Sequence, residues 1–341
     1  MFSHVLEQVM RGESLSSIEA QVAMENIMSG VVPSAQIAAF LTAMRIKGEM
    51  VDEIIGFARA MRGKAISFPD MGKGLVDTCG TGGDGGISFN ISTAAALVAA
   101  AGGARVAKHG NRAVSSKSGS ADVLEALGVT ITGTPEAAAE CLKETDVCFL
   151  FAPNYHKAMK YAAGVRRELG IRTVFNLLGP LTNPAGADRQ LMGVYDRQMG
   201  KSAARALCEL GIQHALVVTG ADGLDEISIS GPTHVVEVCN GEIFSRTIHP
   251  EEFGLSVYPI QAVAGGSAEV NAEIIRRVLA GEPGAYRDIV VLNAGAALYV
   301  SSRAGSIYEG VALAADLLDS GLVQQKLEQI IEVTGGVSHA S

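Results

Sequence analysis

The stretch Cys79–Thr93, CGTGGDGGISFNIST, has five glycines in its first eight residues and four small polar side chains after them. Glycine at this density costs conformational entropy on folding. The backbone must therefore either bend where other residues cannot, or lie directly against a bulky group. The short apolar run at 74–79 predicts a strand before the glycines, and the alanine-rich run at 92–103 predicts a helix after them.

The same alternation of short apolar runs and helical stretches continues along the chain. Helical segments separate the runs, including 120–129, which Gly128 should end. This order predicts an α/β fold with a central, mostly parallel sheet flanked by helices. The predicted strands are 74–79, 104–110, 146–153, 214–220 and 288–295.

The first seventy residues contain helical patterns only. A capping box from Ser16 to Glu19 begins one helix, and two more follow Pro33 and Val51. We expect a small helical domain at 1–70, joined later by a returning helical segment around 165–185, and a large α/β domain at 71–341.

Two apolar stripes in this helical region look too large for so short a segment to bury against itself. We expect part of this surface to cover the crossing at 177–186 and the rest to meet a second copy of the chain. The stripes consist of Ile37, Phe40, Leu41 and Met44, and of Ile54, Ile55, Ala58 and Met61.

Composition excludes several classes of function. Of the 341 residues 48% are hydrophobic, and the formal net charge of −9 offers no general attraction to nucleic acid or to an anionic membrane. The five cysteines form no C-x-x-C pair, which favours free thiols over disulfides or a zinc site. The beginning of the chain does not resemble a signal peptide, and the longest apolar runs are too short to span a bilayer. We expect a cytoplasmic protein.

The glycine stretch also fits the dinucleotide-binding pattern G-x-G-x-x-G at Gly80–Gly85. Two features count against that interpretation. Residues 86–91 separate the third glycine from the helix, and Lys108-His109 stands where an acidic residue should contact a ribose. A cation at that place favours phosphate. The sequence also lacks the G-x-x-x-x-G-K-[ST] motif of a P-loop.

A glycine loop before a helix can bind phosphate in another way. Backbone N–H groups of such a loop point inward, and the first turn of a helix favours an anion. Asn90, Ser92 and Thr93 stand at that helix start. N-capping alone would explain one or two of these polar residues, but not all of them together with the glycines.

A second polar loop, at 108–122, also lies between a strand and a helix. It contains Lys108, Arg112 and Lys117 together with four serines. A solvated basic loop is the simplest alternative explanation. However, loops at the carboxyl ends of neighbouring parallel strands meet in one crevice. The two loops together predict a ligand with phosphate at both ends.

These residues resemble the anthranilate phosphoribosyltransferase family, which has the nucleoside phosphorylase/phosphoribosyltransferase fold. The resemblance implies Mg²⁺-dependent transfer of the phosphoribosyl group of 5-phosphoribosyl 1-pyrophosphate to anthranilate, in tryptophan biosynthesis. It also implies two Mg²⁺ ions per subunit and a homodimer joined through the helical domain. The matching stretches are GTGGDG (80–85), SFNIST (88–93), KHGNR (108–112), SSKSGSAD (115–122), VRRELGIRT (165–173), NLLGPLTNP (176–184) and DGLDEIS (222–228).

The resemblance also assigns individual positions. Anthranilate would contact Gly80, Asn111 and Arg166, and Mg²⁺ would be held by Ser92, Asp225 and Glu226. The positions for 5-phosphoribosyl 1-pyrophosphate would be Gly80, Gly83, Asp84, Ser88, Asn90, Ile91, Ser92, Thr93, Lys108, His109, Gly110, Asn111, Arg112, Ala113, Val114, Ser115, Ser116 and Ser120.

No side chain is expected to act as a catalytic acid or base. An arylamine is neutral at pH 7, so the protein would mainly position the reactants and neutralise charge around an oxocarbenium-like transition state, with inversion at C1. His109 and His156 would line the crevice. Lys157 and Gly164 depart from the family pattern, which commonly has prolines there.

Three other functions remain open at this point. A pyrimidine nucleoside phosphorylase would share the fold but have a different glycine loop and use free phosphate. A nucleic-acid-binding relative without catalysis would have a basic surface and lack the acidic pair Asp225-Glu226. The third is a nicotinamide-dependent dehydrogenase, against which the delayed helix start and Lys108-His109 count.

Overall fold

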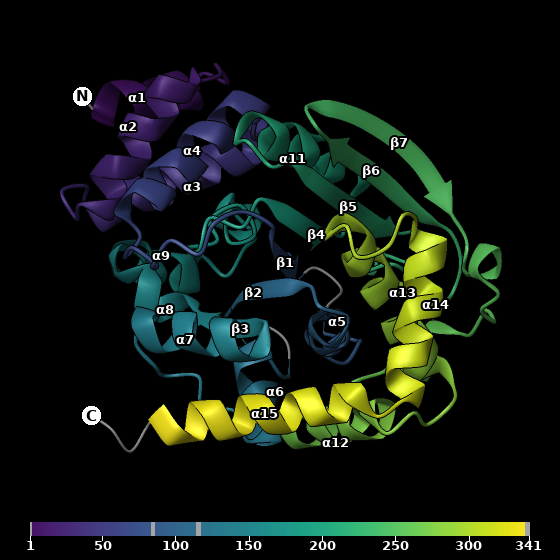
Figure 1. Ribbon diagram of the computed structural model, residues 1–341. Helices are drawn as coiled ribbons and strands as arrows, with labels where there is room; N and C mark the ends of the chain where they lie inside the picture. The colour runs from purple at the N-terminus through teal and green to yellow at the C-terminus, as the bar shows by residue number, and fades with distance from the viewer. Residues whose placement is uncertain (1, 83–85, 114–116, 338–341) are drawn as a thin grey trace.

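The computed structural model describes residues 2–82, 86–113 and 117–337. The strands in these residues form one seven-stranded sheet in the order β3-β2-β1-β4-β5-β6-β7 (Figure 1). The first five strands in that order are parallel, β6 is antiparallel to β5, and β7 is antiparallel to β6. The strands are β1 Leu75–Gly80, β2 Arg105–Gly110, β3 Val147–Phe151, β4 Arg189–Gly193, β5 His214–Gly220, β6 Thr233–Cys239 and β7 Glu242–Ile248.

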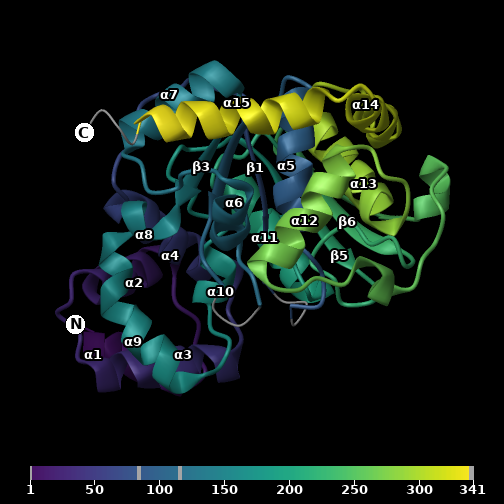
Figure 2. The ribbon, with the colours of Figure 1, turned by 90° about the horizontal axis from the view of Figure 1, so that it is seen from below.

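Helices cover both faces of the sheet, as Figures 1 and 2 show. α5 contacts β1 and β2 and α13 contacts β4 and β5, while α11 packs on β5 and β6. The helices after residue 90 are α5 Ile91–Ala101, α6 Ser120–Leu127, α7 Pro135–Thr145, α8 Ala152–Tyr155, α9 Lys160–Leu169, α10 Phe175–Leu178, α11 Arg197–Glu209, α12 Ala268–Leu279, α13 Ala285–Val300, α14 Ile307–Asp319 and α15 Leu322–Val337.

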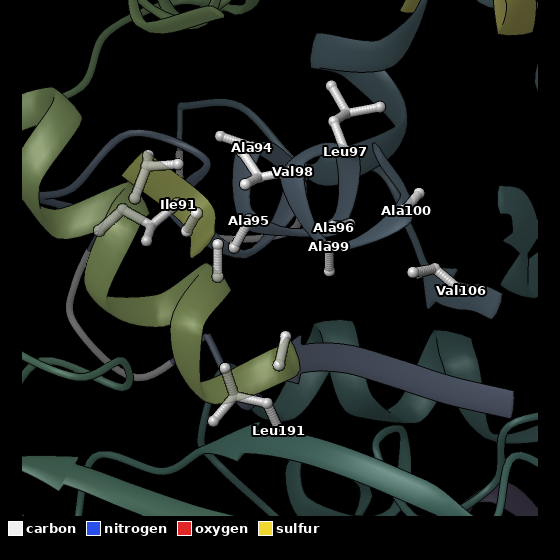
Figure 3. Close-up of a cluster of buried hydrophobic side chains, with 14 of the residues drawn as sticks. Ile91, Ala94, Ala95, Ala96, Leu97, Val98, Ala99, Ala100, Val106 and Leu191 are labelled. Atoms are coloured by element: carbon white, nitrogen blue, oxygen red, sulfur yellow. The ribbon is translucent and has the colours of Figure 1, made fainter. Parts of the chain in front are cut away.

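The side chains of each central strand alternate between two cores, because successive residues of a strand point to opposite faces. Leu191 belongs to the core under α5 and α13, and its neighbour Met192 belongs to the core shared with α11 and the N-terminal helices. α5 is buried on almost every side, which its run of alanines allows (Figure 3). The expected fold class is confirmed.

The N-terminal region consists of α1 Phe2–Met10, α2 Ser17–Met28, α3 Ser34–Lys47 and α4 Val51–Lys64. Ser16 and Glu19 form the predicted capping box. α9 packs on α2 and α3, and Ala162, Val165 and Leu178 join the core of these helices. No helix of the described chain is both long enough and apolar enough to cross a membrane.

The prediction that the two apolar stripes meet a second subunit is wrong. All eight side chains are at most 5% exposed within a single chain. The reason is that α9, α10, α11 and one face of the sheet supply apolar surface that the local sequence does not reveal, and these elements share one core with the stripes.

The predicted strand at 288–295 is also wrong, because these residues lie inside α13. From Ile289 onward every residue of the helix except Tyr299 is buried, so its run is apolar on nearly every side and no helical period shows in the sequence. The strands β4, β6 and β7 were not predicted. β7 is mostly exposed at the edge of the sheet and carries little apolar pattern.

Candidate functional site

Two strands that end in glycine position an acidic segment at the carboxyl edge of the sheet. A Cβ on Gly80, at the end of β1, would lie 2.5 Å from Oδ2 of Asp225, and a Cβ on Gly193, at the end of β4, would collide with the backbone carbonyl of Asp225. Gly193 must therefore be glycine for the chain at 222–226 to lie against the strand ends, and a side chain at Gly80 would displace the Asp225 carboxylate. These two glycines are needed because another segment lies close to them, and not because the backbone bends there.

Asp225 and Glu226 are each fixed by a backbone amide of the first polar loop. Gly82 N donates to Asp225 Oδ2 at 2.7 Å, and Ser92 N donates to Glu226 Oε1 at 3.1 Å. Ser92 lies in the first turn of α5, where backbone amides have no helical partner. Both acidic residues are buried, at 6% and 7% exposure. The structure thus brings together the three residues predicted to hold metal.

These carboxylates fit a hard divalent cation by the chemistry of their donors, since Mg²⁺ prefers carboxylate and phosphate oxygens. In the described residues no group of three or more His, Cys, Asp or Glu side chains could enclose a metal ion. An ion at Asp225 and Glu226 would therefore need oxygen ligands from a bound substrate or from water. Such an arrangement is usual for Mg²⁺ beside phosphates.

Lys108 of β2 extends from the sheet toward α5. Its Nζ donates to the carbonyl of Thr78 and, at 3.2 Å, to Ser92 Oγ. The residue is 4% exposed, and burial lowers the pKa of Lys108, while the neighbouring Asp77 partly offsets this effect. Lys108 therefore links β1, β2 and the first turn of α5, and it places a positive charge behind the glycine loop.

Asn90 joins the two polar loops. It occupies the N-cap position of α5, but its side chain makes no capping bond. Instead, its Nδ2 donates to Ser118 O at 3.2 Å, and its Oδ1 accepts from Ser118 Oγ and from Nδ2 of Asn271 on α12. Capping therefore does not explain Asn90, and the two loops do meet as their strand order predicts.

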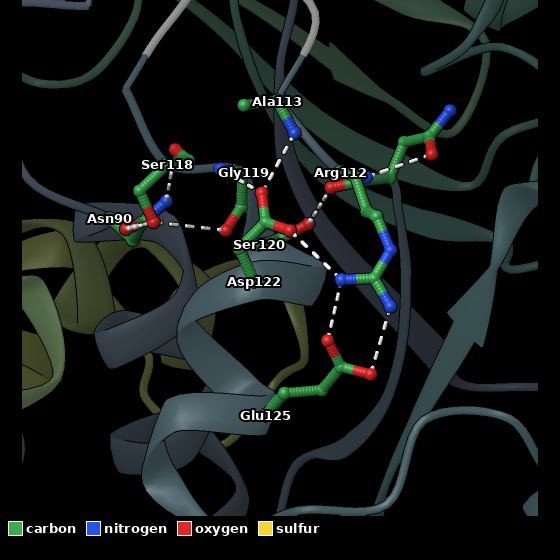
Figure 4. A network of polar contacts seen from close by, with 9 residues as sticks. Asn90, Arg112, Ala113, Ser118, Gly119, Ser120, Asp122 and Glu125 are labelled. Carbon is green, nitrogen blue, oxygen red and sulfur yellow. Dashed lines mark hydrogen bonds and ion pairs between the residues drawn. The ribbon is translucent and has the colours of Figure 1, made fainter. Parts of the chain in front are cut away.

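Asp122 organises the second loop, although the sequence analysis did not single it out (Figure 4). Its Oδ2 accepts from the amides of Ala113 and Gly119, each at 2.9 Å, and its Oδ1 accepts from Arg112. Arg112 also forms a two-point contact with Glu125, at 2.5 and 2.9 Å. In this structure the guanidinium of Arg112 is therefore bound to carboxylates of α6.

The other predicted phosphate-site residues take varied positions. Gly110 ends β2 against Ser120 and Phe149, while Asn111 accepts from Ser120 Oγ at 3.4 Å. Ser88 pairs with Ala264 in an isolated bridge, and Ile91 is a core residue at 1% exposure. Five predicted positions lie outside the described residues: Gly83, Asp84, Val114, Ser115 and Ser116.

A buried polar cluster lies on the other face of β1 and β2. Asp77 is fully buried and accepts from His109 N at 3.1 Å and from Asn183 Nδ2 at 2.8 Å. Asn183 Nδ2 also donates to Ala107 O at 2.7 Å. Burial raises the pKa of Asp77 to about 6, opposed chiefly by Lys108. This cluster was not predicted, and the sequence signal for it is an aspartate in an apolar strand beside the glycine loop.

Two histidines meet at the edge of this cluster. The rings of His109 and His156 lie 5.1 Å apart, and His156 Nε2 contacts the carbonyl of Thr182 at 3.0 Å. Burial, and then His156, lowers the pKa of His109 to about 3, and burial also lowers the pKa of His156. Both rings are therefore uncharged at neutral pH, in line with a lining role.

Arg166 lies on α9, in the helical part of the molecule. Its guanidinium stacks over the Phe175 ring at 5.1 Å, and burial lowers its pKa. No acidic side chain in the described chain forms an ion pair with it. Its neighbour Arg167 is exposed. A half-buried cation without a partner is suited to bind an anionic ligand.

Comparison with known protein families shows to which class of enzyme the chain belongs. The family model for the helical bundle domain of a glycosyl transferase family matches residues 3–65, and the model for its a/b domain matches residues 72–324. The fold and these matches define a glycosyltransferase with a helical bundle and an α/β domain.

Individual relatives narrow this class. The anthranilate phosphoribosyltransferase of Brevibacillus brevis is 58% identical over all 341 residues, with full coverage of both chains. The crystal structure of that enzyme from Thermus thermophilus has a TM-score of 0.92 at 46% identity, covering 97% of this chain and 99% of the other. The Saccharomyces cerevisiae enzyme in complex with PRPP and Mg has a TM-score of 0.90 at 27% identity, with 98% coverage of each.

The chain belongs to the anthranilate phosphoribosyltransferase family. The resemblance inferred from the motifs is thereby confirmed, and so is the prediction of a glycosyltransferase enzyme. The helix after the glycine loop begins at Ile91 and not at the third glycine, which argues against the dinucleotide-binding alternative.

Proposed function

We propose that this enzyme transfers the phosphoribosyl group of 5-phosphoribosyl 1-pyrophosphate to anthranilate, giving N-(5-phosphoribosyl)anthranilate and pyrophosphate. The pair Asp225 and Glu226 carries this proposal. Two buried carboxylates, held by amides of the glycine loop and of the α5 first turn, would bind a metal ion beside the phosphates of the donor. The yeast relative binds PRPP and Mg, which supports the same assignment.

The donor would lie between the two polar loops that Asn90 joins. The positive end of the α5 dipole would face its negative oxygens, and Lys108 would add a fixed positive charge behind them. Because Arg112 is held by Glu125 and Asp122, it would contact the donor only by exchanging these partners. The positions assigned by resemblance, from Gly80 to Ser120, all belong to these loops or to the elements that bear them.

Mg²⁺ would be held by Asp225 and Glu226, with Ser92 beside them, and we propose two ions per subunit. When bound, the metal supplies Lewis acidity toward the departing pyrophosphate oxygens. The protein residues fix the position: Gly82 N and Ser92 N orient the two carboxylates, and Gly193 admits the segment that carries them.

Anthranilate would approach from the side of α9. Arg166, half-buried and without an acidic partner in the described chain, would pair with its carboxylate, and Gly80 and Asn111 would complete the contact. The neutral rings of His109 and His156 would line the path without taking a proton. Attack by the neutral amine on an oxocarbenium-like C1 would invert that carbon, so no side chain need serve as a catalytic base.

We also propose a homodimer joined through the helical domain, in the cytoplasm, with domains at 1–70 plus 165–185 and at 71–341. Since the predicted stripes are internal, other side chains must form the interface. Ile46 and Met50 are exposed by 82% and 54% at the ends of α3 and α4. Between them lies Lys47, which forms an ion pair at 2.8 Å with the fully buried Glu53.

The decisive experiment mixes the protein with 5-phosphoribosyl 1-pyrophosphate, Mg²⁺ and anthranilate and follows the loss of anthranilate fluorescence. Loss that requires all three components is the expected result. No loss, combined with phosphorolysis of thymidine, would instead assign a pyrimidine nucleoside phosphorylase.

A further inference from the structure

A cavity of about 280 Å³ lies beside the predicted phosphate site, between β3, α5, α7 and α15. In Figure 2 these elements surround the end of the sheet at β3. The walls are mostly apolar and include Phe149, Phe151 and Ala138, while Thr93, Lys108 and Tyr155 bring polar atoms to them. None of the roles proposed above uses this space.

Two hydroxyl groups on the wall are not used by the fold. Thr93 is 1% exposed, and its Oγ1 is buried without a hydrogen-bond partner among the described residues. Tyr155 is 2% exposed, and none of the hydrogen bonds found between described residues involves its hydroxyl. A buried polar atom without a partner costs stability, so Thr93 Oγ1 is suited to bind a ligand atom, and the Tyr155 side chain borders the same cavity.

We propose that this cavity binds a neutral two-ring aromatic molecule that carries one hydrogen-bonding group. An apolar cavity of about 150 Å³ is enough to hold benzene, so the larger space suits two fused rings. An anion does not fit, because the Lys108 ammonium is already bonded to Thr78 O and Ser92 Oγ, and burying an unpaired charge is costly. The residues after α15, SHAS at 338–341, are mostly polar and match the apolar walls poorly.

Occupancy of the cavity should affect the phosphate loops. Phe151 stacks against Arg112 at 5.6 Å, and the ring of Phe149 lies against Gly110. Thr93 and Lys108 belong both to the cavity wall and to the predicted phosphate site. A molecule that presses on these residues would change the affinity for pyrophosphate, and by linkage pyrophosphate would change the affinity for that molecule. This coupling rests on the proposed function, whereas the binding itself does not.

The first test uses 2-naphthol with the full-length chain and no substrate. The chain contains no tryptophan, so the fluorescence of the probe can be followed with little protein background. We expect saturable binding of one molecule per chain, unaffected by excess anthranilate and retained in Arg166→Ala. Absence of saturable binding would overturn the proposal, and so would displacement by anthranilate, which would place the probe in the acceptor site.

Matched variants locate the probe. Ala138→Leu should abolish binding by filling the cavity, and Ala138→Ser, which keeps the volume, should not. Tyr155→Phe should weaken binding of 2-naphthol roughly three- to tenfold, the effect of one lost hydrogen bond, and leave naphthalene unaffected. Tyr161→Phe, on an exposed tyrosine of α9, is the control.

Equal affinities in all four variants would overturn this location. Binding that appears only after deletion of 338–341 would show that the chain's own end occupies the cavity, which is also contrary to the proposal.

Calorimetric titration with pyrophosphate and Mg²⁺ tests the coupling. Saturating 2-naphthol should shift the dissociation constant of pyrophosphate by roughly fivefold or more. An unchanged constant, with binding of 2-naphthol intact, would overturn the coupling. If pyrophosphate itself failed to bind, the proposed function would fail and the fluorescence result would still decide on the cavity.

Discussion

At the scale of single residues, Arg166 gives the most specific test of the proposed acceptor site. Arg166→Ala should raise the KM for anthranilate steeply while leaving binding of 5-phosphoribosyl 1-pyrophosphate nearly normal, because only a contact with the acceptor carboxylate is removed. Loss of a charged hydrogen-bonding pair of this kind costs roughly 2–3 kcal/mol, or about 30- to 150-fold in kcat/KM. Steady-state kinetics with each substrate varied in turn provides the measurement.

The next residue along the helix is the control for Arg166. Arg167 has the same charge but is exposed, and adjacent positions of a helix point in different directions. Arg167→Ala should therefore change the kinetics little. Equal effects of the two substitutions would rule out Arg166 as the carboxylate partner.

The acidic pair gives a second prediction. Asp225→Asn combined with Glu226→Gln keeps the size of both side chains but removes two negative charges. Activity should fall, and the Mg²⁺ concentration needed for half-maximal activity should rise, because fewer anionic oxygens remain to bind the ion. An unchanged Mg²⁺ titration would mean that these carboxylates only join the glycine loop to α5.

The third prediction concerns acid stability. Burial and His156 lower the pKa of His109 to about 3, against roughly 6.5 for an unperturbed histidine. Between these values the unfolded chain binds a proton that the folded chain does not, so the free energy of unfolding falls as the pH falls through this window. His109→Gln removes that contribution, which by pH 5 amounts to roughly 1–2 kcal/mol.

Urea unfolding at pH 7.5 and at pH 5 measures this difference. The native chain should lose more stability between the two pH values than His109→Gln does, and His249→Gln, at an exposed position, should behave like the native chain. Asp77, whose pKa burial raises to about 6, acts in the opposite direction, but it is present in all three proteins. Equal losses in all three would contradict a neutral, buried His109.

At the scale of elements, adding one methyl group at the end of β4 tests how closely this strand approaches the segment 222–226. Gly193→Ala would drive a Cβ into the backbone of Asp225. We expect the free energy of unfolding to fall by about 1–3 kcal/mol, the usual cost of overpacking, and the Mg²⁺ concentration needed for half-maximal activity to rise. Gly231→Ala is the control, since its Cβ would meet no atom within 4 Å. Chemical denaturation of both variants decides the matter.

The sequence predicted helices and strands well where capping residues, glycines or a helical spacing of apolar residues mark them locally. The capping box Ser16–Glu19, the start of α5 after residue 90 and the end of α6 at Gly128 are all confirmed. It failed for α13, because a helix buried on nearly every side has the same apolar composition as a buried strand. It also missed the exposed edge strand β7, whose regular structure comes from pairing with β6 and not from an apolar pattern.

At the scale of the whole molecule, the proposed dimer must use surface that one chain leaves exposed. Ile46→Glu places a charge on an 82% exposed apolar position of the helical region, and it should shift the chain from dimer to monomer in sedimentation. Val257→Glu, on the α/β part and 48% exposed, is the matched control and should leave the assembly unchanged. A native chain that sediments as a monomer with full activity would refute the dimer.

Within the candidate site, the sequence alone predicted the chemistry. Two glycine- and serine-rich loops after neighbouring strands, and a lysine where a nucleotide-binding fold needs an acid, indicated a phosphate site, and the family resemblance at DGLDEIS implied a metal site. Only the tertiary structure decided which partners these residues have. It placed Asp225 on Gly82 and Glu226 on Ser92, bound Arg112 to Glu125, buried Asp77 beside Asn183, and turned the helical stripes inward. The physical reason is that motifs and capping depend on residues a few positions apart, whereas burial and pairing depend on surfaces supplied by other segments, 13 residues away for Arg112 and Glu125 and more than a hundred for Asp225, Glu226 and Asp77.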